Sequence, residues 1–247
     1  MRTLNYLLAF GCLCLLNIAC QGQTPKKEVS EETAKPITGL IEDVLTQAEQ
    51  DALTPTMVLT ALEEGNKRFR SNDLTARNHS EMVRKSTLQQ FPKAIVLSCV
   101  DSRVPVEDVF DRGIGDIFVA RVAGNFVNED ILGSMEFATK VSGAKLVLVM
   151  GHEHCGAVKA SIDQVELGNI TPMLSKIWPA VVAVDYEGDR SSKNQGFVEK
   201  VCESNVRLTM ENIRSQSPIM KELEAEGAIK IVGAVYNMAT GKVELLP

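Results

Sequence analysis

The chain contains the stretch Ala94-Ile95-Val96-Leu97-Ser98-Cys99-Val100-Asp101-Ser102-Arg103, and later the stretch Lys145-Leu146-Val147-Leu148-Val149-Met150-Gly151-His152-Glu153-His154-Cys155. Each begins with a continuous apolar run, which is typical of a strand that is buried on both faces of a sheet. Each run then ends in side chains that can bind a metal ion or move a proton. The pattern predicts strands that lead directly into a functional site.

Further apolar runs follow the same pattern along the chain. We expect four strands, and segments of helical period separate them. The expected strands are residues 94–98, 116–121, 145–150 and 228–236, and the clearest helical segments are 131–141, 197–216 and the residues that follow Pro55-Thr56. Strands that alternate with helices predict an α/β fold with a central, mostly parallel sheet flanked by helices.

In such sheets, sites form at the carboxyl ends of strands where the strand order reverses. Cys99 ends the first expected strand, and His152 and Cys155 follow the third. Gly151 and Gly156 bracket the second pair and predict that its strand has ended by His152. If the first and third strands are neighbours, the three side chains converge.

Two thiols and an imidazole form a soft ligand set that suits zinc, and a three-ligand zinc site keeps a fourth position for water. Asp101 and Arg103 are two residues apart, so in an extended segment they can pair. A forked arginine can then hold the carboxylate away from the metal, where it can accept a hydrogen bond from zinc-bound hydroxide. A surface ion pair is the alternative interpretation.

Two alternatives to this ligand set remain at this point. Cys99 and Cys155 could be buried structural cysteines, with His152 as a capping residue. A zinc site of three histidines, His79, His152 and His154, is also conceivable, and the chain has no other histidine. Cys202 lies in a helical pattern and is expected to be a small buried apolar residue.

The composition narrows the class of protein. The chain has 247 residues, of which 45% are hydrophobic and 23% charged, so a globular core is expected. The net charge of -6 argues against nucleic acid as a partner. Three cysteines remain beyond the first twenty residues, and this odd number does not suit a disulfide framework.

The amino terminus resembles a secretory signal. Arg2 precedes an apolar stretch that is too short to span a bilayer comfortably, and Ala19-Cys20 follows it. We expect residues 1–19 to be a signal peptide, either of the lipoprotein type with Cys20 lipidated or of the ordinary cleaved type. Residues 20–55 are expected to be a polar tether that includes a helical arm over residues 37–53, and residues 56–247 the catalytic domain. The protein is thus expected to be exported and periplasmic, with a membrane link only through the lipid.

Cys-x-Asp-x-Arg followed by His-x-x-Cys resembles the signature of the β-class carbonic anhydrases. The similarity continues in several other segments, which together extend it over residues 56–246. These segments are Gln90-Phe91-Pro92-Lys93, Gly115–Asn125, Ser134-Met135-Glu136-Phe137-Ala138, Val235-Tyr236 and Thr240-Gly241-Lys242-Val243.

The resemblance implies one Zn²⁺ per subunit, held by Cys99, His152 and Cys155, with Asp101 and Arg103 as the catalytic pair. It also implies that Gln90 donates a hydrogen bond to bicarbonate, that Phe118 and Phe137 line an apolar pocket for carbon dioxide, and that Gly156 leaves room for substrate beside the metal. Phe118 and Phe137 could equally be ordinary aromatic residues of the core.

The implied reaction is the reversible hydration of carbon dioxide to bicarbonate and a proton by zinc-bound hydroxide, in a homodimer or larger homo-oligomer. Hydrolysis of carbon disulfide or carbonyl sulfide on the same scaffold is an alternative, as is a zinc- or bicarbonate-binding module without turnover. Some relatives carry a tryptophan three residues before the first cysteine, as part of an inhibitory bicarbonate site. Val96 stands there in this chain, so we expect no such site and an Asp101–Arg103 pair near neutral pH.

Overall fold

The computed structural model describes residues 40–247, which belong to one compact unit. The expected signal peptide, Cys20 and most of the expected tether lie outside the described residues. Within residues 40–247, none of the helices combines the length and apolarity that crossing a bilayer requires.

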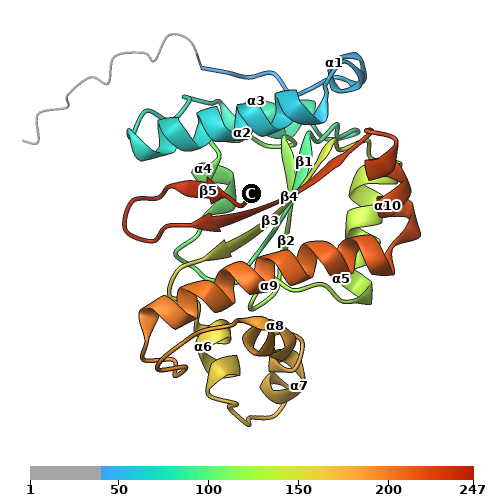
Figure 1. Cartoon of the computed structure of the whole chain (residues 1–247). Coiled ribbons are helices and arrows are strands. Elements are labelled where there is room, and N and C mark those ends of the chain that lie inside the picture. The colour runs from blue at the N-terminus through green and yellow to red at the C-terminus, as the bar shows by residue number, and fades with distance from the viewer. Residues whose placement is uncertain (1–39) are drawn as a thin grey trace, which may run out of the picture. The chain divides into compact units, whose positions relative to one another are not determined.

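A five-stranded sheet occupies the centre of this unit, and its strands run in the order β2-β1-β3-β4-β5 (Figure 1). The strands are β1 (Ala94–Ser98), β2 (Ile117–Arg121), β3 (Leu146–His152), β4 (Lys230–Tyr236) and β5 (Val243–Leu245). The first four are parallel, and β5 pairs antiparallel with β4. All residues of β1 and β3 are buried, as their continuous apolar runs predict. The expected fold class is therefore confirmed.

The chain order along the sheet reverses between β1 and β3. The chain passes from β1 to β2 on one side, and then crosses back over β1 to form β3 on its other side. The two strands are in register, with Ser98 opposite Met150. Their carboxyl ends therefore lie side by side at the switch point of the sheet, where a parallel sheet opens a crevice for a site.

Helices cover both faces of the sheet (Figure 1). They are α1 (Gln47–Asp51), α2 (Pro55–Arg70), α3 (His79–Lys85), α4 (Val106–Val109), α5 (Glu129–Glu136), the π-helix η1 (Phe137–Val141), α6 (Gly156–Ile162), α7 (Ile170–Leu174), α8 (Trp178–Ala183), α9 (Gln195–Gln216) and α10 (Pro218–Ala225). One buried apolar cluster joins α2 and α4 to the sheet, and a second joins α5, α9 and α10 to it.

The long helix α9 determines how the carboxyl ends of the strands are packed. Its buried positions follow a spacing of three or four residues, so one stripe of the helix faces the sheet. The buried residues are Phe197, Val198, Val201, Cys202, Asn205, Val206, Thr209 and Ile213. The expectation that Cys202 is a small buried residue is confirmed, since 3% of it is exposed.

Three expectations about secondary structure need correction. Within residues 40–53 only Gln47–Asp51 is helical, because Ile41 instead forms a bridge with Arg77 and Thr46 caps a new helix. The strand β3 has not ended by His152 but includes it, because His152 still pairs with Tyr236 of β4. The expected helix over 131–141 begins earlier, at Glu129, and its last turn is a π-helix.

Candidate metal centre

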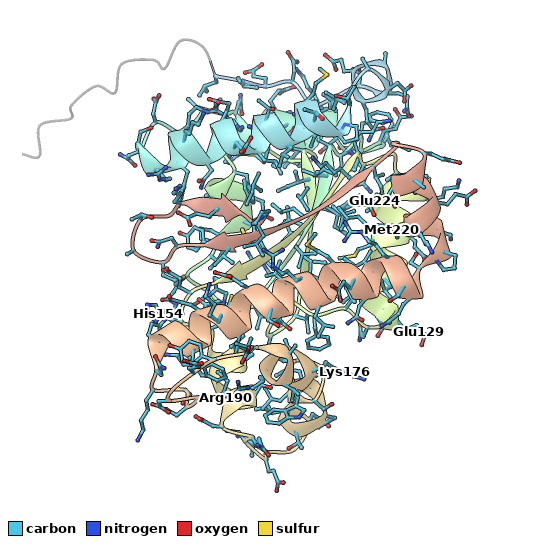
Figure 2. The ribbon with its side chains drawn as sticks, in the orientation of Figure 1. Glu129, His154, Lys176, Arg190, Met220 and Glu224 are labelled. Carbon is cyan, nitrogen blue, oxygen red and sulfur yellow. The ribbon has the colours of Figure 1, made fainter. Side chains whose placement is uncertain are left out.

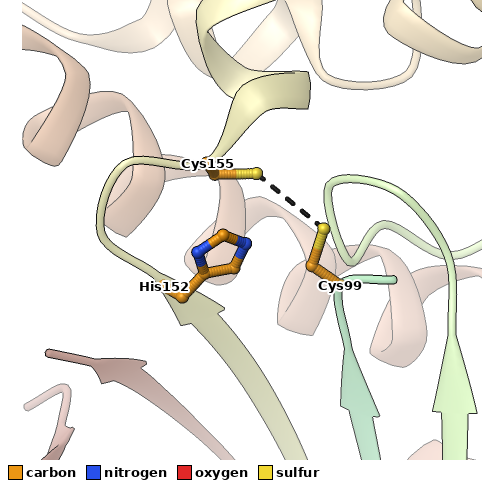
Figure 3. A group of neighbouring side chains, drawn as sticks. All are labelled: Cys99, His152 and Cys155. Carbon is orange, nitrogen blue, oxygen red and sulfur yellow. Dashed lines mark hydrogen bonds between the residues drawn. The ribbon is translucent and has the colours of Figure 1, made fainter. Parts of the chain in front are cut away.

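Three side chains converge where β1 and β3 end (Figure 3). Cys99 follows β1, His152 is the last residue of β3, and Cys155 precedes the first turn of α6. One ligand atom of each lies within 4.8 Å of the others, and all three residues are buried. The topology therefore brings together two loops that are far apart in the sequence, as the apolar runs predicted.

The imidazole of His152 presents one particular nitrogen to the two sulfurs. Its Nδ1 lies 2.8 Å from the backbone oxygen of Glu153. Because a carbonyl oxygen can only accept, Nδ1 carries a proton, and in the neutral imidazole the lone pair is then on Nε2. Nε2 is buried and has no hydrogen-bond partner. A buried acceptor without a partner is costly, and a metal ion at this point would satisfy it.

The two thiols behave as a coupled pair. Their sulfurs are 4.0 Å apart, well beyond the length of a disulfide, and both cysteines are free. A hydrogen bond from the Cys155 thiol, helped by His152 and by the backbone N–H of Gly124, lowers the pKa of Cys99. The same interaction raises the pKa of Cys155, because a second anion beside the first is unfavourable. A divalent cation would stabilise both thiolates together.

The donor set therefore fits zinc. Two thiolate sulfurs and one imidazole nitrogen match the Cys₂His sets that leave a fourth position open. Among residues 40–247, no other group of three or more metal-binding side chains comes together in this way. The interpretation of Cys99 and Cys155 as mere core cysteines does not account for the unpartnered Nε2 between them.

Asp101 and Arg103 form the expected direct pair. The guanidinium donates from Nε to Oδ1 at 2.9 Å and from Nη2 to Oδ2 at 2.7 Å, and the backbone N–H of Arg103 also donates to Oδ1. These hydrogen bonds hold the pKa of the Asp101 carboxyl well below its usual range. Oδ2 is 3.7 Å from Nε2 of His152, so the carboxylate borders the ligand cluster.

Sequence reasoning missed the residues that hold this loop in place. The Arg121 guanidinium donates to the backbone oxygens of Cys99 and Val104, and so brackets the loop that carries the acid–base pair. The N–H of Gly124 donates to the Cys99 sulfur, and Asn205 of α9 in turn donates to the oxygen of Gly124. Arg121 is half-buried at the carboxyl end of β2, and an arginine at the end of an otherwise apolar strand is the signal in the sequence that points to such a role.

The rival set of three histidines does not assemble. His79 begins α3 and is exposed, and His154 is exposed with a φ of 55°. That left-handed conformation turns the chain out of the strand direction, so His152 and His154 do not face the same way. His154 instead lies near the start of α9 (Figure 2), where its Nδ1 is 3.0 Å from Oε1 of Gln195.

The expected substrate-binding residues divide into two groups. Gly156 starts α6 directly after Cys155, and a Cβ there would meet open space. Gln90, in contrast, is exposed and lies before β1, at the opposite end of a strand about 17 Å long. Phe118 is paired with Ile95 near the start of the strand, and Phe137 contacts Phe118 edge to face with ring centroids 6.2 Å apart. The two rings share an open pocket on which none of the three ligands borders.

Comparison with known proteins adds independent evidence. A family profile described as "Carbonic anhydrase" matches residues 94–243. A carbonic anhydrase of Mycolicibacterium smegmatis is 33% identical over 197 residues, which cover 77% of this chain and 93% of that protein. Carbonic anhydrase 2 of Mycobacterium tuberculosis is 32% identical over the same length. The solved structure of a Coccomyxa β-carbonic anhydrase in complex with acetazolamide is 28% identical, with a TM-score of 0.61, and covers 76% of this chain and 84% of that one.

Proposed function

The chain belongs to the carbonic anhydrase family, in its β class, and from this we propose that it catalyses the reversible hydration of carbon dioxide to bicarbonate and a proton. Cys99, His152 and Cys155 fit the zinc site of that family. When bound, zinc supplies a Lewis acid that activates water near neutral pH, an effect for which carbonic anhydrase is itself the standard example.

The single observation that carries the proposal is the placement of Asp101. Its carboxylate borders the ligand cluster, yet three hydrogen bonds from Arg103 occupy it. A free carboxylate at this distance could move in as a fourth ligand and block the site. Because Arg103 competes for both oxygens, Asp101 remains an acceptor that can orient a water molecule and receive its hydrogen bond. A purely structural zinc site has no need of such a pair.

The remaining chemistry follows from the surroundings. Both thiols are buried, so the ligand cluster is shielded from bulk water on the protein side. The open space at Gly156 leaves room beside the metal position for a small linear substrate. Regulated relatives have a tryptophan where this chain has Val96, which is fully buried within β1. We therefore propose that the chain lacks their inhibitory bicarbonate site.

Stopped-flow hydration of carbon dioxide tests the proposal. We expect the zinc-loaded wild type to be active, and Asp101→Ala to bind zinc normally but lose activity by roughly 10²- to 10⁴-fold. Ser102→Ala, an exposed position in the same loop, serves as the control and should keep its activity. A fully zinc-loaded wild type without turnover would indicate a binding module, and preferential turnover of carbon disulfide or carbonyl sulfide would indicate the alternative hydrolase.

We also propose that the active unit is a homodimer or a larger homo-oligomer, because Gln90, Phe118 and Phe137 do not reach the ligand cluster of their own chain. A second copy could supply them. The edge strand β2 supports this, since all five of its residues are only partly buried although most are apolar. Phe137 of η1 contacts Phe118 edge to face and is 49% exposed, so it extends the same apolar surface.

The amino terminus leads to a proposal about location. We propose that residues 1–19 direct export, that Cys20 is lipidated, and that residues 20–55 tether the domain 56–247 to a membrane in the periplasm. The apolar stretch before Ala19-Cys20 and the polar composition of the following segment support this. Mass spectrometry of the mature protein would show a lipidated Cys20, or else an ordinary cleaved end.

A further inference from the structure

Glu153 follows the zinc ligand His152 and is itself tied to another part of the fold. Its Oε1 accepts a hydrogen bond from Asn237 Nδ2, and its Oε2 accepts one from the backbone N–H of Met238, each at 2.9 Å. Its backbone N–H donates to the oxygen of Tyr236, the last residue of β4. No lysine or arginine within residues 40–247 forms an ion pair with it, so this carboxylate is held by hydrogen-bond donors alone.

Asn237 is a rigid partner for this carboxylate. Its Oδ1 accepts hydrogen bonds from the N–H groups of Ala239 and Thr240 and from the Thr240 hydroxyl. Its backbone pairs with Lys242 across the turn that joins β4 to β5. The amide oxygen is therefore fully used by the turn, and only the Nδ2 group points to Glu153.

The backbone of Glu153 makes the contact that matters for the metal. Its carbonyl accepts from Nδ1 of His152 at 2.8 Å and so selects the tautomer whose Nε2 faces the two sulfurs. The next residue, His154, has a φ of 55°, so the chain turns sharply just after this carbonyl. Without a side-chain anchor, the peptide between Glu153 and His154 could rotate, and the carbonyl would leave the imidazole.

We propose that Glu153 is a positioning residue for the zinc site: its carboxylate, fixed by Asn237 and Met238, holds the Glu153 carbonyl on His152 Nδ1 and thereby orients the imidazole toward the metal. Partners behind a metal ligand typically change metal affinity by 10- to 100-fold. Here the group behind the ligand His152 is the backbone carbonyl of Glu153. A substitution can therefore change its position only through the Glu153 side chain, which holds this peptide in place. The inference rests on the proposed role of His152 as a zinc ligand.

The test measures zinc release from the full-length, zinc-loaded protein into an excess of a chromophoric chelator. We expect Glu153→Ala to release zinc about tenfold faster or more, and Glu153→Gln to lie between it and the wild type, because the amide keeps one acceptor. Asn237→Asp keeps the turn acceptor but places a second carboxylate against Glu153, so it should also release zinc faster. Glu244→Gln removes the same charge from neighbouring β5, where Glu244 pairs with Lys242, and should release zinc at the wild-type rate.

A second readout separates orientation from general loosening. Nitrogen-15 NMR of the three histidines should show a Nδ1 proton on His152 that is protected from exchange in the wild type and loses protection in the Glu153→Ala protein. The double variant of Glu153→Ala with Asn237→Asp should release zinc no faster than the faster single variant, since both break one link.

The outcomes distinguish this inference from the proposed function. A wild type that binds no zinc overturns the ligand assignment itself. A wild type that holds zinc, with wild-type release and an unchanged Nδ1 proton in Glu153→Ala, overturns only the role of Glu153. Should Glu153→Ala fail to fold, Glu153→Gln and Asn237→Asp allow the same decision, with wild-type release in both as the contradicting result.

Discussion

Gly151 lies in β3 immediately before the ligand His152, and the packing above it leaves no room for a side chain. A Cβ at this position would be 2.8 Å from Cys202 Sγ and 2.8 Å from Val206 Cγ2, both on α9. Ordinary contacts between such atoms are about 3.5–4.0 Å, so α9 would have to move by close to an ångström. Cys202 and Val206 are both buried, which leaves them little freedom to turn away.

We therefore expect Gly151→Ala to reduce the free energy of unfolding by about 1–3 kcal/mol, the usual cost of overpacking a core. For a domain of this size the urea m-value is about 2–3 kcal/mol/M, so the midpoint should fall by roughly 0.3–1.5 M. Adding Cys202→Ala removes one of the two clashes. The double variant should be more stable than the sum of the single effects predicts, by about 0.5 kcal/mol or more.

Gly156→Ala is the matched control, five residues along the chain. Apart from its chain neighbours and the backbone of its own helix, no heavy atom lies within 4 Å of its added Cβ, and alanine suits a helix better than glycine does. Urea unfolding followed by circular dichroism on the zinc-loaded proteins should show a midpoint equal to or above that of the wild type. The reasoning is refuted if Gly151→Ala unfolds at the wild-type midpoint, or if Gly156→Ala loses as much stability as Gly151→Ala.

Two further predictions concern the rest of the fold and the assembly. Asp111 is 1% exposed and accepts hydrogen bonds from Arg68, Thr75 and Arg77. Asp111→Asn should therefore lower the free energy of unfolding, measured in urea, by about 3 kcal/mol. The control Asp108→Asn, at an exposed position, should change it little. Burial alone would raise the pKa of Asp111, but these hydrogen bonds lower it overall. The wild type should therefore keep the free energy of unfolding that ionised Asp111 contributes above about pH 4, and lose it as the pH falls through the folded pKa. Asp111→Asn should show no such loss. If Gln90 serves the site of a second copy, mixing Gln90→Ala chains with Asp101→Ala chains should restore hydration, because each mixed dimer has one complete site; with random exchange, roughly a quarter of wild-type activity is expected. Mixtures that stay as inactive as their components would place Gln90 outside the partner's site.

The strands and the ligand set could be predicted because both depend on local patterns. The runs at 94–98 and 145–150 are apolar at every position but their ends, which only a doubly covered strand accommodates. Polar side chains that directly follow such runs lie at the carboxyl edge of the sheet, where the strands end. Cys99, His152 and Cys155 were therefore expected to converge, and the structure brings them together.

Other features depend on partners that are distant in sequence, and their local patterns misled. The residues around Ile41 have an amphipathic period, yet Ile41 bridges to Arg77 instead of continuing a helix. Gly151 resembles a strand end, but it is small because α9 packs directly on β3, and His152 remains in the strand opposite Tyr236. In both cases a tertiary contact outweighs the local preference.

The chain's pattern of residues thus specified which side chains meet and what metal chemistry they suit, because hydrophobic periodicity and ligand type are encoded position by position. How those side chains are held came from the fold. Three residues donate hydrogen bonds to the site from other elements of the fold. They are Arg121 to the oxygen of Cys99, Asn205 to the oxygen of Gly124, and Asn237 to the carboxylate of Glu153. Hydrogen bonds of this kind depend on distances between segments far apart in the chain, which no periodicity along the sequence records.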